Sequence, residues 1–309
     1  MPILVPKGLP AYSILKDENV FVMHEEVAER QDIRPIDIAI VNLMPIKEVT
    51  ETQLIRMLAN TPLQVSLHLL TMGSHESRHT DRLHMESFYD TFDEIRNRRF
   101  DGMIITGAPV EFLPFEDVDY WDELSNIMAY TTRNVFSTMH ICWGAQAGLY
   151  FHYGIDKHVL PEKIFGVFSH RVCKSNSQLM RGFDELFFAP HSRHTQIRRD
   201  DVLRTEGLDI LAESDEAGLH IVATPRLRRI FVQGHSEYER DTLKLEYERD
   251  LGLGLVTGPP RNYFRGDSGE VVVNWSGHGN LFFANWLNYV YQETFYDLSM
   301  FDSLDEGDL

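Results

Sequence analysis

The chain has 309 residues, of which 43% are hydrophobic and 25% charged, so it can bury the core of a soluble enzyme with one large or two small domains. Its net charge of −18 argues against nucleic-acid binding, which needs a basic face. Two cysteines without a CxxC motif indicate a reducing compartment and no disulfide framework. With no apolar run near the ~18 residues of a membrane span and no signal peptide, we expect a cytoplasmic protein without membrane contact.

The first half of the chain predicts a parallel crossover. Residues 1–35 contain four prolines and a helix-like stretch at 20–30, which we interpret as an N-terminal extension packed on the main domain. The apolar run 36–43 predicts a strand, 48–59 an amphipathic helix, and 63–70 a second strand. A strand, a helix and a strand at this spacing indicate a right-handed parallel connection.

A polar, histidine-containing segment follows at residues 71–85. Its three histidines, His75, His79 and His84, could in principle bind a metal. No cysteine accompanies them, and Gly73 disfavours the helix that would align them. We therefore expect a solvated loop near the mouth of the active site, and no metal.

The next elements lead to a ligand-binding edge. Residues 88–98 predict a helix, and 100–106 a strand that runs into the glycine-containing turn 107–111. Such a turn at the carboxyl end of a parallel strand is where α/β folds place ligands. A helix at 117–131 then leads to a buried strand at 135–141.

Cys142 follows that strand at once, with Trp143 and Gly144 behind it and a predicted helix start after them. This is the layout of a nucleophile elbow, in which a strand turns sharply into a helix. The helix N-terminus favours a thiolate and a bound oxyanion. The alternative is a buried structural cysteine, because free cysteine is among the most buried residue types.

A second stretch complements this cysteine. His235 and Glu237 stand just beyond an apolar strand and are separated by one residue. A thiol needs a base to accept its proton, and the base needs a carboxylate to fix its tautomer. Cys142, His235 and Glu237 are thus a candidate catalytic triad at strand ends.

The remaining pattern predicts one domain, residues 36–300, followed by an acidic tail, 301–309. In addition to the elements above, we predict strands at 164–172, 186–189, 208–213, 218–223 and 230–233, and helices at 240–251 and 279–296.

These motifs resemble known families. Residues 142–146 are similar to the Cys-x-Gly-x-Gln elbow of class I glutamine amidotransferases, and residues 235–237 to their His-x-Glu. A narrower resemblance, to the homoserine O-acyltransferases of methionine biosynthesis, spans nearly the whole chain. It is carried by Asn42-Leu43-Met44-Pro45, Lys47 with Thr50-Glu51, Gly107-Ala108-Pro109, His140-Ile141-Cys142-Trp143-Gly144, Gly166-Val167-Phe168, Pro190-His191-Ser192-Arg193 and Gly234-His235-Ser236-Glu237-Tyr238.

The resemblance implies a fold and a reaction. The fold is α/β and flavodoxin-like, class I glutamine amidotransferase-like, with a mostly parallel sheet and helices on both faces. In the reaction, Cys142 takes an acyl group from acyl-coenzyme A, and His235, oriented by Glu237, then activates the hydroxyl of L-homoserine. The N–H of Trp143 and the Ala108, Pro109 and Val110 loop would hold the oxyanion. Acyl-CoA is then a cosubstrate, no cofactor is tightly bound, and a homodimer is allowed.

The same resemblance assigns substrate contacts to Lys163, Ser192 and Arg249. The alternative for Arg249 is a surface ion pair, for example with Glu246 or Glu248. For the phosphates of coenzyme A, Lys47 and the basic turn 226–229 are the candidates that the sequence offers.

Glu111 matches the family's specificity position, with Glu in acetyl users and Gly in succinyl users. A carboxylate there would repel the terminal carboxylate of a succinyl group and occupy its volume, so we predict a homoserine O-acetyltransferase. The first alternative is a succinyltransferase, which a neighbouring arginine could favour by neutralising Glu111.

More remote alternatives are a glutamine amidotransferase, a cysteine hydrolase of the same fold, and a non-enzymatic interaction protein. His140 stands where amidotransferases usually carry glycine, and Gly-Ala-Pro at 107–109 replaces their Pro-Gly-Gly-type loop. Both differences disfavour glutamine hydrolysis.

Overall fold

The computed structural model of the chain describes residues 3–6, 8–18, 22–24, 34–75, 80–254, 258–294 and 298. A twelve-stranded sheet runs through these residues. Its strands are β1 (Ile3–Val5), β2 (Val22–His24), β3 (Ile36–Val41), β4 (Val65–Thr71), β5 (Tyr89–Thr91), β6 (Phe100–Ile105), β7 (Val135–Ile141), β8 (His158–Val172), β9 (Leu186–Gln196), β10 (Asp209–Ser214), β11 (Gly218–Ala223) and β12 (Arg229–Val232).

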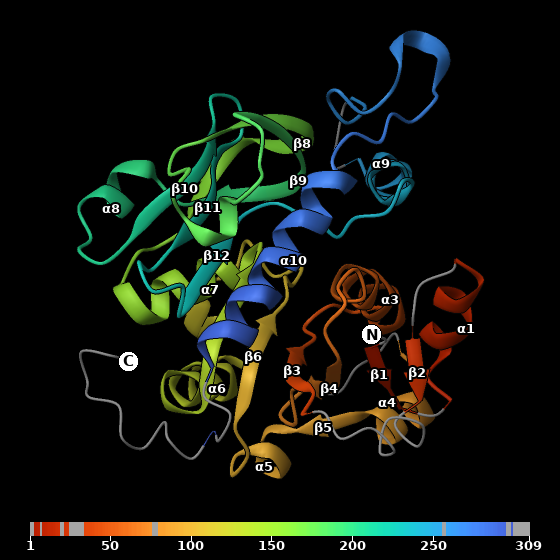
Figure 1. Ribbon diagram of the computed structural model, residues 1–309. Helices are drawn as coiled ribbons and strands as arrows, with labels where there is room; N and C mark the ends of the chain where they lie inside the picture. Colours follow the sequence, from red (N-terminus) through yellow and green to blue (C-terminus); the bar gives the residue numbers. More distant parts are fainter. Residues whose placement is uncertain are drawn as a thin grey trace.

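The helices lie on either side of this sheet (Figure 1). They are α1 (Pro10–Asp17), α3 (Lys47–Leu58), α4 (Arg82–Phe88), α5 (Phe92–Ile95), α6 (Trp121–Asn134), α7 (Trp143–Tyr153), α8 (Arg199–Leu203), α9 (Thr242–Gly252) and α10 (Ser276–Glu293), with 3₁₀ turns η1 (Phe115–Asp117), η2 (Gln178–Met180) and η3 (Gly266–Ser268). No helix in the described part of the chain combines the length and apolar character that a bilayer crossing requires.

The strand order is β2-β1-β4-β3-β6-β7-β12-β11-β10-β8-β9, and β5 pairs with β4 at the side. Neighbours from β2 to β12, and the β4–β5 pair, run parallel. The pairs from β12 through β9 run antiparallel. The predicted mostly parallel sheet with helices on both faces is confirmed.

Two apolar cores explain why the central strands are apolar throughout, as expected for strands covered on both faces. One core joins α1, α3 and α10 to the sheet through residues such as Leu54, Phe282 and Trp286. The other joins α6 to the opposite face through Leu124 and Ile127. All seven residues of β7 are buried between these layers.

The carboxyl ends of four neighbouring parallel strands meet at one edge of the sheet. The N–H of Thr106, after β6, donates to the carbonyl of Val41 at 3.1 Å, and the N–H of Cys142, after β7, donates to that of Val232 at 2.7 Å. The loops that follow β3, β6, β7 and β12 therefore lie side by side. They carry the motifs that the sequence singled out.

Several local predictions were wrong. The helix expected at 20–30 is a strand at Val22–His24, which pairs with β1; residues 25–30 lie outside the described part. The loop expected at 71–85 contains the start of α4, because the Asp81 carboxylate accepts the N–H of Leu83 at 2.7 Å and caps a helix. The helix at 88–98 is divided between β5 and α5. Strands β8 and β9 are longer than predicted, because they pair with each other.

Candidate active site

Cys142 occupies a sharp turn between β7 and α7. Its backbone has φ 52° and ψ −116°, a conformation that costs a non-glycine residue free energy and clusters at functional sites. Gly144 permits this turn, because a Cβ on it would lie 2.5 Å from the carbonyl oxygen of Thr106. The strand–turn–helix predicted around Cys142 is confirmed, and the cysteine is buried.

His235 and Glu237 reach the same place from the loop after β12. The Nδ1 of His235 lies 2.6 Å from Oε1 of Glu237. The Tyr238 ring stacks on the imidazole with centroids 4.2 Å apart. Held in this way, the imidazole lies close enough to the Cys142 side chain for that side chain to raise its pKa. The structure therefore brings together the three predicted catalytic residues.

The electrostatics of His235 suit a thiol activator. Burial lowers its pKa, but the charges of Cys142 and Glu237 and their hydrogen bonds outweigh burial and raise the pKa well above its usual value. At neutral pH the imidazole is therefore protonated beside the sulfur. An imidazolium stabilises negative charge on a neighbouring sulfur, and the thiolate is the nucleophilic form of cysteine.

The turns after β6 and β7 bring backbone groups next to Cys142. The N–H of Trp143 is the first of α7, a position without an intrahelical acceptor. A Cβ on Gly107 would lie 3.3 Å from the Cβ of the cysteine and 3.8 Å from the Trp143 nitrogen. Ala108 and Pro109 line the catalytic cavity, but Pro109 has no N–H to donate. Val110 lines a different, neighbouring cavity.

A cavity of about 240 Å³ opens over the nucleophile, and Lys163, Ser192 and Arg249 all line it. The Nζ of Lys163 lies 2.6 Å from one oxygen of Asp250, and Nη2 of Arg249 lies 2.7 Å from the other. Arg249 thus has an ion-pair partner, although neither of the two glutamates that the sequence offered. Its side chain remains 62% exposed, so it can still receive a ligand.

Glu246 is a residue of this cavity that sequence reasoning did not assign to it. It accepts hydrogen bonds from the Ser192 hydroxyl at 2.5 Å and from the Tyr238 hydroxyl at 2.8 Å. It lies on α9 three residues before Arg249, so one helical turn presents a carboxylate and a guanidinium to the same cavity. That Glu-x-x-Arg spacing on a predicted helix was the available signal.

Glu111 lines the same cavity as Cys142. One of its oxygens accepts the N–H of His194 at 3.4 Å. Burial raises the pKa of this carboxyl, against the opposing effects of that N–H and of the charges on Lys163, His235 and Arg193. The specificity residue suggested by the sequence therefore lines the same cavity as the predicted nucleophile.

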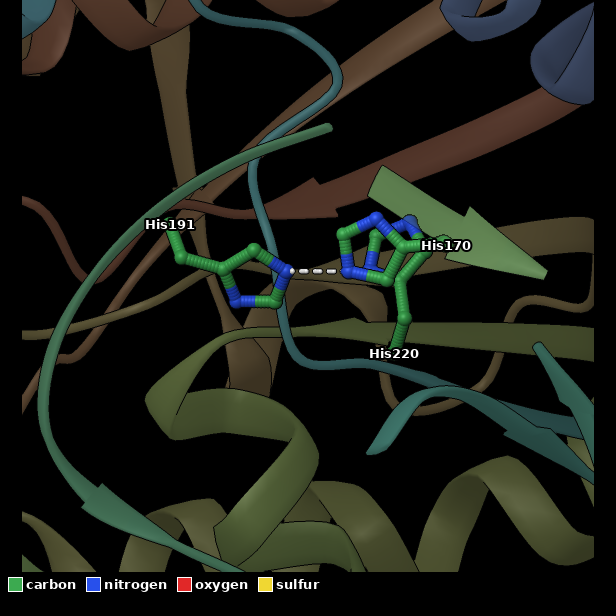
Figure 2. A group of neighbouring side chains, drawn as sticks. All are labelled: His170, His191 and His220. Carbon is green, nitrogen blue, oxygen red and sulfur yellow. Dashed lines mark hydrogen bonds between the residues drawn. The ribbon is translucent and has the colours of Figure 1, made fainter. Parts of the chain in front are cut away.

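Three further buried histidines gather near this site (Figure 2). His170 of β8, His191 of β9 and His220 of β11 bring ring nitrogens within 4.8 Å of one another, and the Nε2 atoms of His170 and His191 are 3.0 Å apart. Burial lowers the pKa of all three, so they are neutral. The buried guanidinium of Arg193 donates to His191 at 3.4 Å and would repel a second cation. We interpret the cluster as polar packing.

The histidines of the segment 71–85 have separate partners. His75 lies 2.6 Å from Asp119, and His84 lies 2.9 Å from the buried Glu51. His79 lies outside the described residues. The two described histidines do not form a shared coordination site.

The basic turn at 226–229 precedes β12, at the end of that strand away from His235, where the carbonyl of Arg228 accepts the N–H of Thr138 in the middle of β7. A cavity of about 660 Å³ adjoins it. Although this cavity is larger, it is far from the triad, so we assign the chemistry to the smaller one. The suggested contact of this turn with the phosphates of a cosubstrate stays a prediction.

Comparison with known proteins decides the family. The sequence model of the family described as homoserine O-succinyltransferase matches residues 2–296. The chain belongs to this family. Proteins named homoserine O-acetyltransferase from Brevibacillus brevis and Acetivibrio thermocellus are 59% and 56% identical to it, over 97% of this chain and 99% of theirs. One so named from Bacillus cereus is 58% identical over 96% of this chain and all of its own. The chain is thus a member of a homoserine O-acyltransferase family, whose description names a succinyl donor, whereas these relatives are named for acetyl transfer.

Solved structures support the fold. A glutamine amidotransferase from Thermotoga maritima superimposes with a TM-score of 0.56 at 11% identity, covering 85% of this chain and all of that one. A glutamine amidotransferase from Methylobacillus flagellatus gives 0.53 at 13% identity, over 86% of this chain and 99% of that one. At these identities the likeness shows the class I glutamine amidotransferase-like fold, as predicted.

Proposed function

We propose that this protein is a homoserine O-acetyltransferase that uses acetyl-CoA in methionine biosynthesis, in the cytoplasm. The observation that carries the acyl preference is Glu111 in the same cavity as Cys142. The family membership and the names of the relatives at 56–59% identity support the reaction class.

The geometry supports a two-step transfer. The Cys142 thiolate attacks the thioester carbonyl, the carbon–sulfur bond to coenzyme A breaks, and the leaving thiolate takes the proton of His235. His235 then accepts the proton of the homoserine hydroxyl, whose oxygen attacks the acyl-cysteine and expels the Cys142 thiolate. Glu237 keeps the imidazole oriented in both steps. The Trp143 N–H and the adjoining loop stabilise the oxyanion, at ~3–4 kcal/mol per donor.

The two oppositely charged residues on α9, Glu246 and Arg249, fit an amino-acid substrate. Arg249 presents a guanidinium, which binds a carboxylate through two parallel hydrogen bonds. Glu246 presents a carboxylate one turn away and would accept an α-ammonium group. Ser192, which already donates to Glu246, holds that carboxylate in position. Lys163 fixes Asp250, and Asp250 in turn orients Arg249.

Glu111 discriminates between acyl groups by charge and by volume. Two like charges ~4 Å apart repel by about 4 kcal/mol at an effective dielectric of ~20, which corresponds to roughly a thousandfold preference. Because burial raises the pKa of Glu111, the charge contribution should weaken as pH falls, whereas the volume contribution should not.

The test is to measure kcat/KM for acetyl-CoA and succinyl-CoA with the native enzyme and with Glu111→Gly. We expect the native enzyme to prefer acetyl-CoA and the variant to shift toward succinyl-CoA. A native preference for succinyl-CoA, or no shift in the variant, would contradict the assignment. Glutamine alone should release no ammonia.

A further inference from the structure

The catalytic cavity cannot enclose the acyl donor. Its volume of about 240 Å³ is below the ~300–1,000 Å³ typical of small-molecule sites, and one side of it is lined by the charged residues Glu246, Arg249 and Asp250. A coenzyme A thioester carries a long pantetheine arm behind the reacting sulfur. The arm must leave the cavity by another side.

A second cavity of about 460 Å³ adjoins that other side. We call it the side groove; Leu43, Lys47, Val110, Leu113, Val118 and Tyr120 are among the residues that line it. Met44 and Pro109 line both the side groove and the catalytic cavity. Pro109 is exposed and Met44 half-buried, so the boundary between the two is at the surface. A flexible chain can cross it without opening the core.

The chemistry of the side groove matches the arm. Val110, Leu113, Val118 and Tyr120 give it apolar walls that suit methylene and methyl groups. Its inner end carries Asn42 and Lys47, and the Lys47 ammonium donates to the Asn42 carbonyl. These polar groups suit the amide groups of the pantetheine arm. The α9 residues that line the catalytic cavity, Glu246 and Arg249, are charged and suit a zwitterion instead.

We propose that the side groove binds the pantetheine arm of the acyl-CoA donor, so that donor and amino acid approach Cys142 from opposite sides. This proposal rests on the proposed function. The rim of the groove carries His75 and Asp119, which are 2.6 Å apart. The negatively charged nucleotide end would therefore extend past this rim into solvent, and Asp119 would oppose it.

Leu113→Asp tests the proposal. Leu113 is 44% exposed, so the fold tolerates a polar side chain there, while a carboxylate would meet the arm. We expect the KM for acetyl-CoA to rise tenfold or more, about 1.4 kcal/mol. The kcat/KM for S-acetyl-N-acetylcysteamine, which lacks most of the arm, and the KM for homoserine should stay within about twofold. Leu203→Asp, at an exposed apolar residue on the distant α8, is the matched control and should change none of these values.

Asp119→Lys is the second variant, at a side chain that is 62% exposed. It should lower the KM for acetyl-CoA severalfold at low salt, less at high salt, and leave the short donor unaffected. If Leu113→Asp slows both donors equally, or neither, and Asp119→Lys leaves the KM for acetyl-CoA unchanged, the assignment of the groove is wrong. If the native enzyme acetylates homoserine from neither donor, the proposed function itself fails.

Discussion

The pKa values of the buried histidines shift in opposite directions in two parts of the molecule, at His235 and in the cluster of His170, His191 and His220. His235 has its pKa raised despite burial, because Cys142 and Glu237 surround it. His191 and His220 are equally buried and have their pKa lowered, because burial is reinforced by neighbouring histidines and by Arg193. The comparison teaches that burial alone does not identify a catalytic histidine. The charge of its partners decides whether it holds a proton.

The two sets of histidine also differ in their access to the catalytic cavity. His235 lines the cavity that also contains Cys142, so its proton can be exchanged with a substrate. His170 and His191 bond to each other and line neither this cavity nor the side groove. A cluster of three ring nitrogens is thus a weaker indicator of chemistry than one imidazole between a sulfur and a carboxylate.

The largest effect should come from removing the nucleophile. Cys142→Ala should abolish both acyl transfer and the mass increase that intact-protein mass spectrometry shows after exposure to acetyl-CoA, because no other residue accepts the acyl group. Cys173 is exposed and lies at the end of β8, so Cys173→Ala should keep both. A normal adduct on the Cys142 variant would show that the nucleophile is elsewhere.

Replacing His235, the proposed base, should lower activity somewhat less than removing the nucleophile. His235→Asn should lower kcat by about 10²- to 10⁴-fold, the range for general acid–base catalysis. Glu237→Gln should lower it less, because the imidazole remains and loses only its orientation and charge support. His220→Asn, at an equally buried histidine, is the control for packing damage. If it matched His235→Asn while remaining folded, the distinction between the two sets would be lost.

The sequence predicted the catalytic edge well because its signals are local. Strand 135–141, the turn at Cys142 and the strand before His235 are all marked by apolar runs that end abruptly, and parallel strands bring those ends to one edge. β11 was predicted with its observed bounds, Gly218–Ala223. These features need only the pattern of neighbouring residues.

The features that were missed depend on pairing between distant segments. β2 forms because Val22–His24 lies beside β1, and a short apolar stretch read alone also suits a helix. The histidine cluster forms because three strands far apart in sequence meet. Glu246 joins the cavity because α9 packs beside β9, whose Ser192 donates to this carboxylate. Residue patterns do not specify such contacts.

Substitutions in the residues proposed to bind homoserine should have weaker effects, mainly on KM. Glu246→Gln keeps the size of the side chain but removes the charge that would bind an ammonium group, so the KM for homoserine should rise about tenfold. Arg249→Lys should also raise it, because a bidentate fork becomes a point charge. The KM for acetyl-CoA and the acyl-enzyme yield should not change in either variant. An unchanged KM for homoserine would return both residues to a structural role on α9.

The smallest effect is a pH dependence of stability that arises from the buried neutral histidines. For a histidine buried in its neutral form, the folded pKa lies below the unfolded value of ~6.5, so the unfolded chain binds the proton first. Stability is therefore present above ~pH 6.5 and is lost as pH falls, by up to ~1.4 kcal/mol per pH unit for each such group. His170, with a pKa that burial lowers to about 3, contributes to this loss of stability from ~pH 6.5 down to that pKa. Urea unfolding between pH 7.5 and 5 should thus give a shallower loss of unfolding free energy in His170→Gln than in the native protein.

His235 does not give the mirror image of this effect. Burial lowers its pKa, and the charge of Cys142, ahead of that of Glu237, raises it, so replacing His235 also removes the partner of the sulfur. An unchanged slope in His170→Gln would contradict the conclusion that burial holds that imidazole in its neutral form.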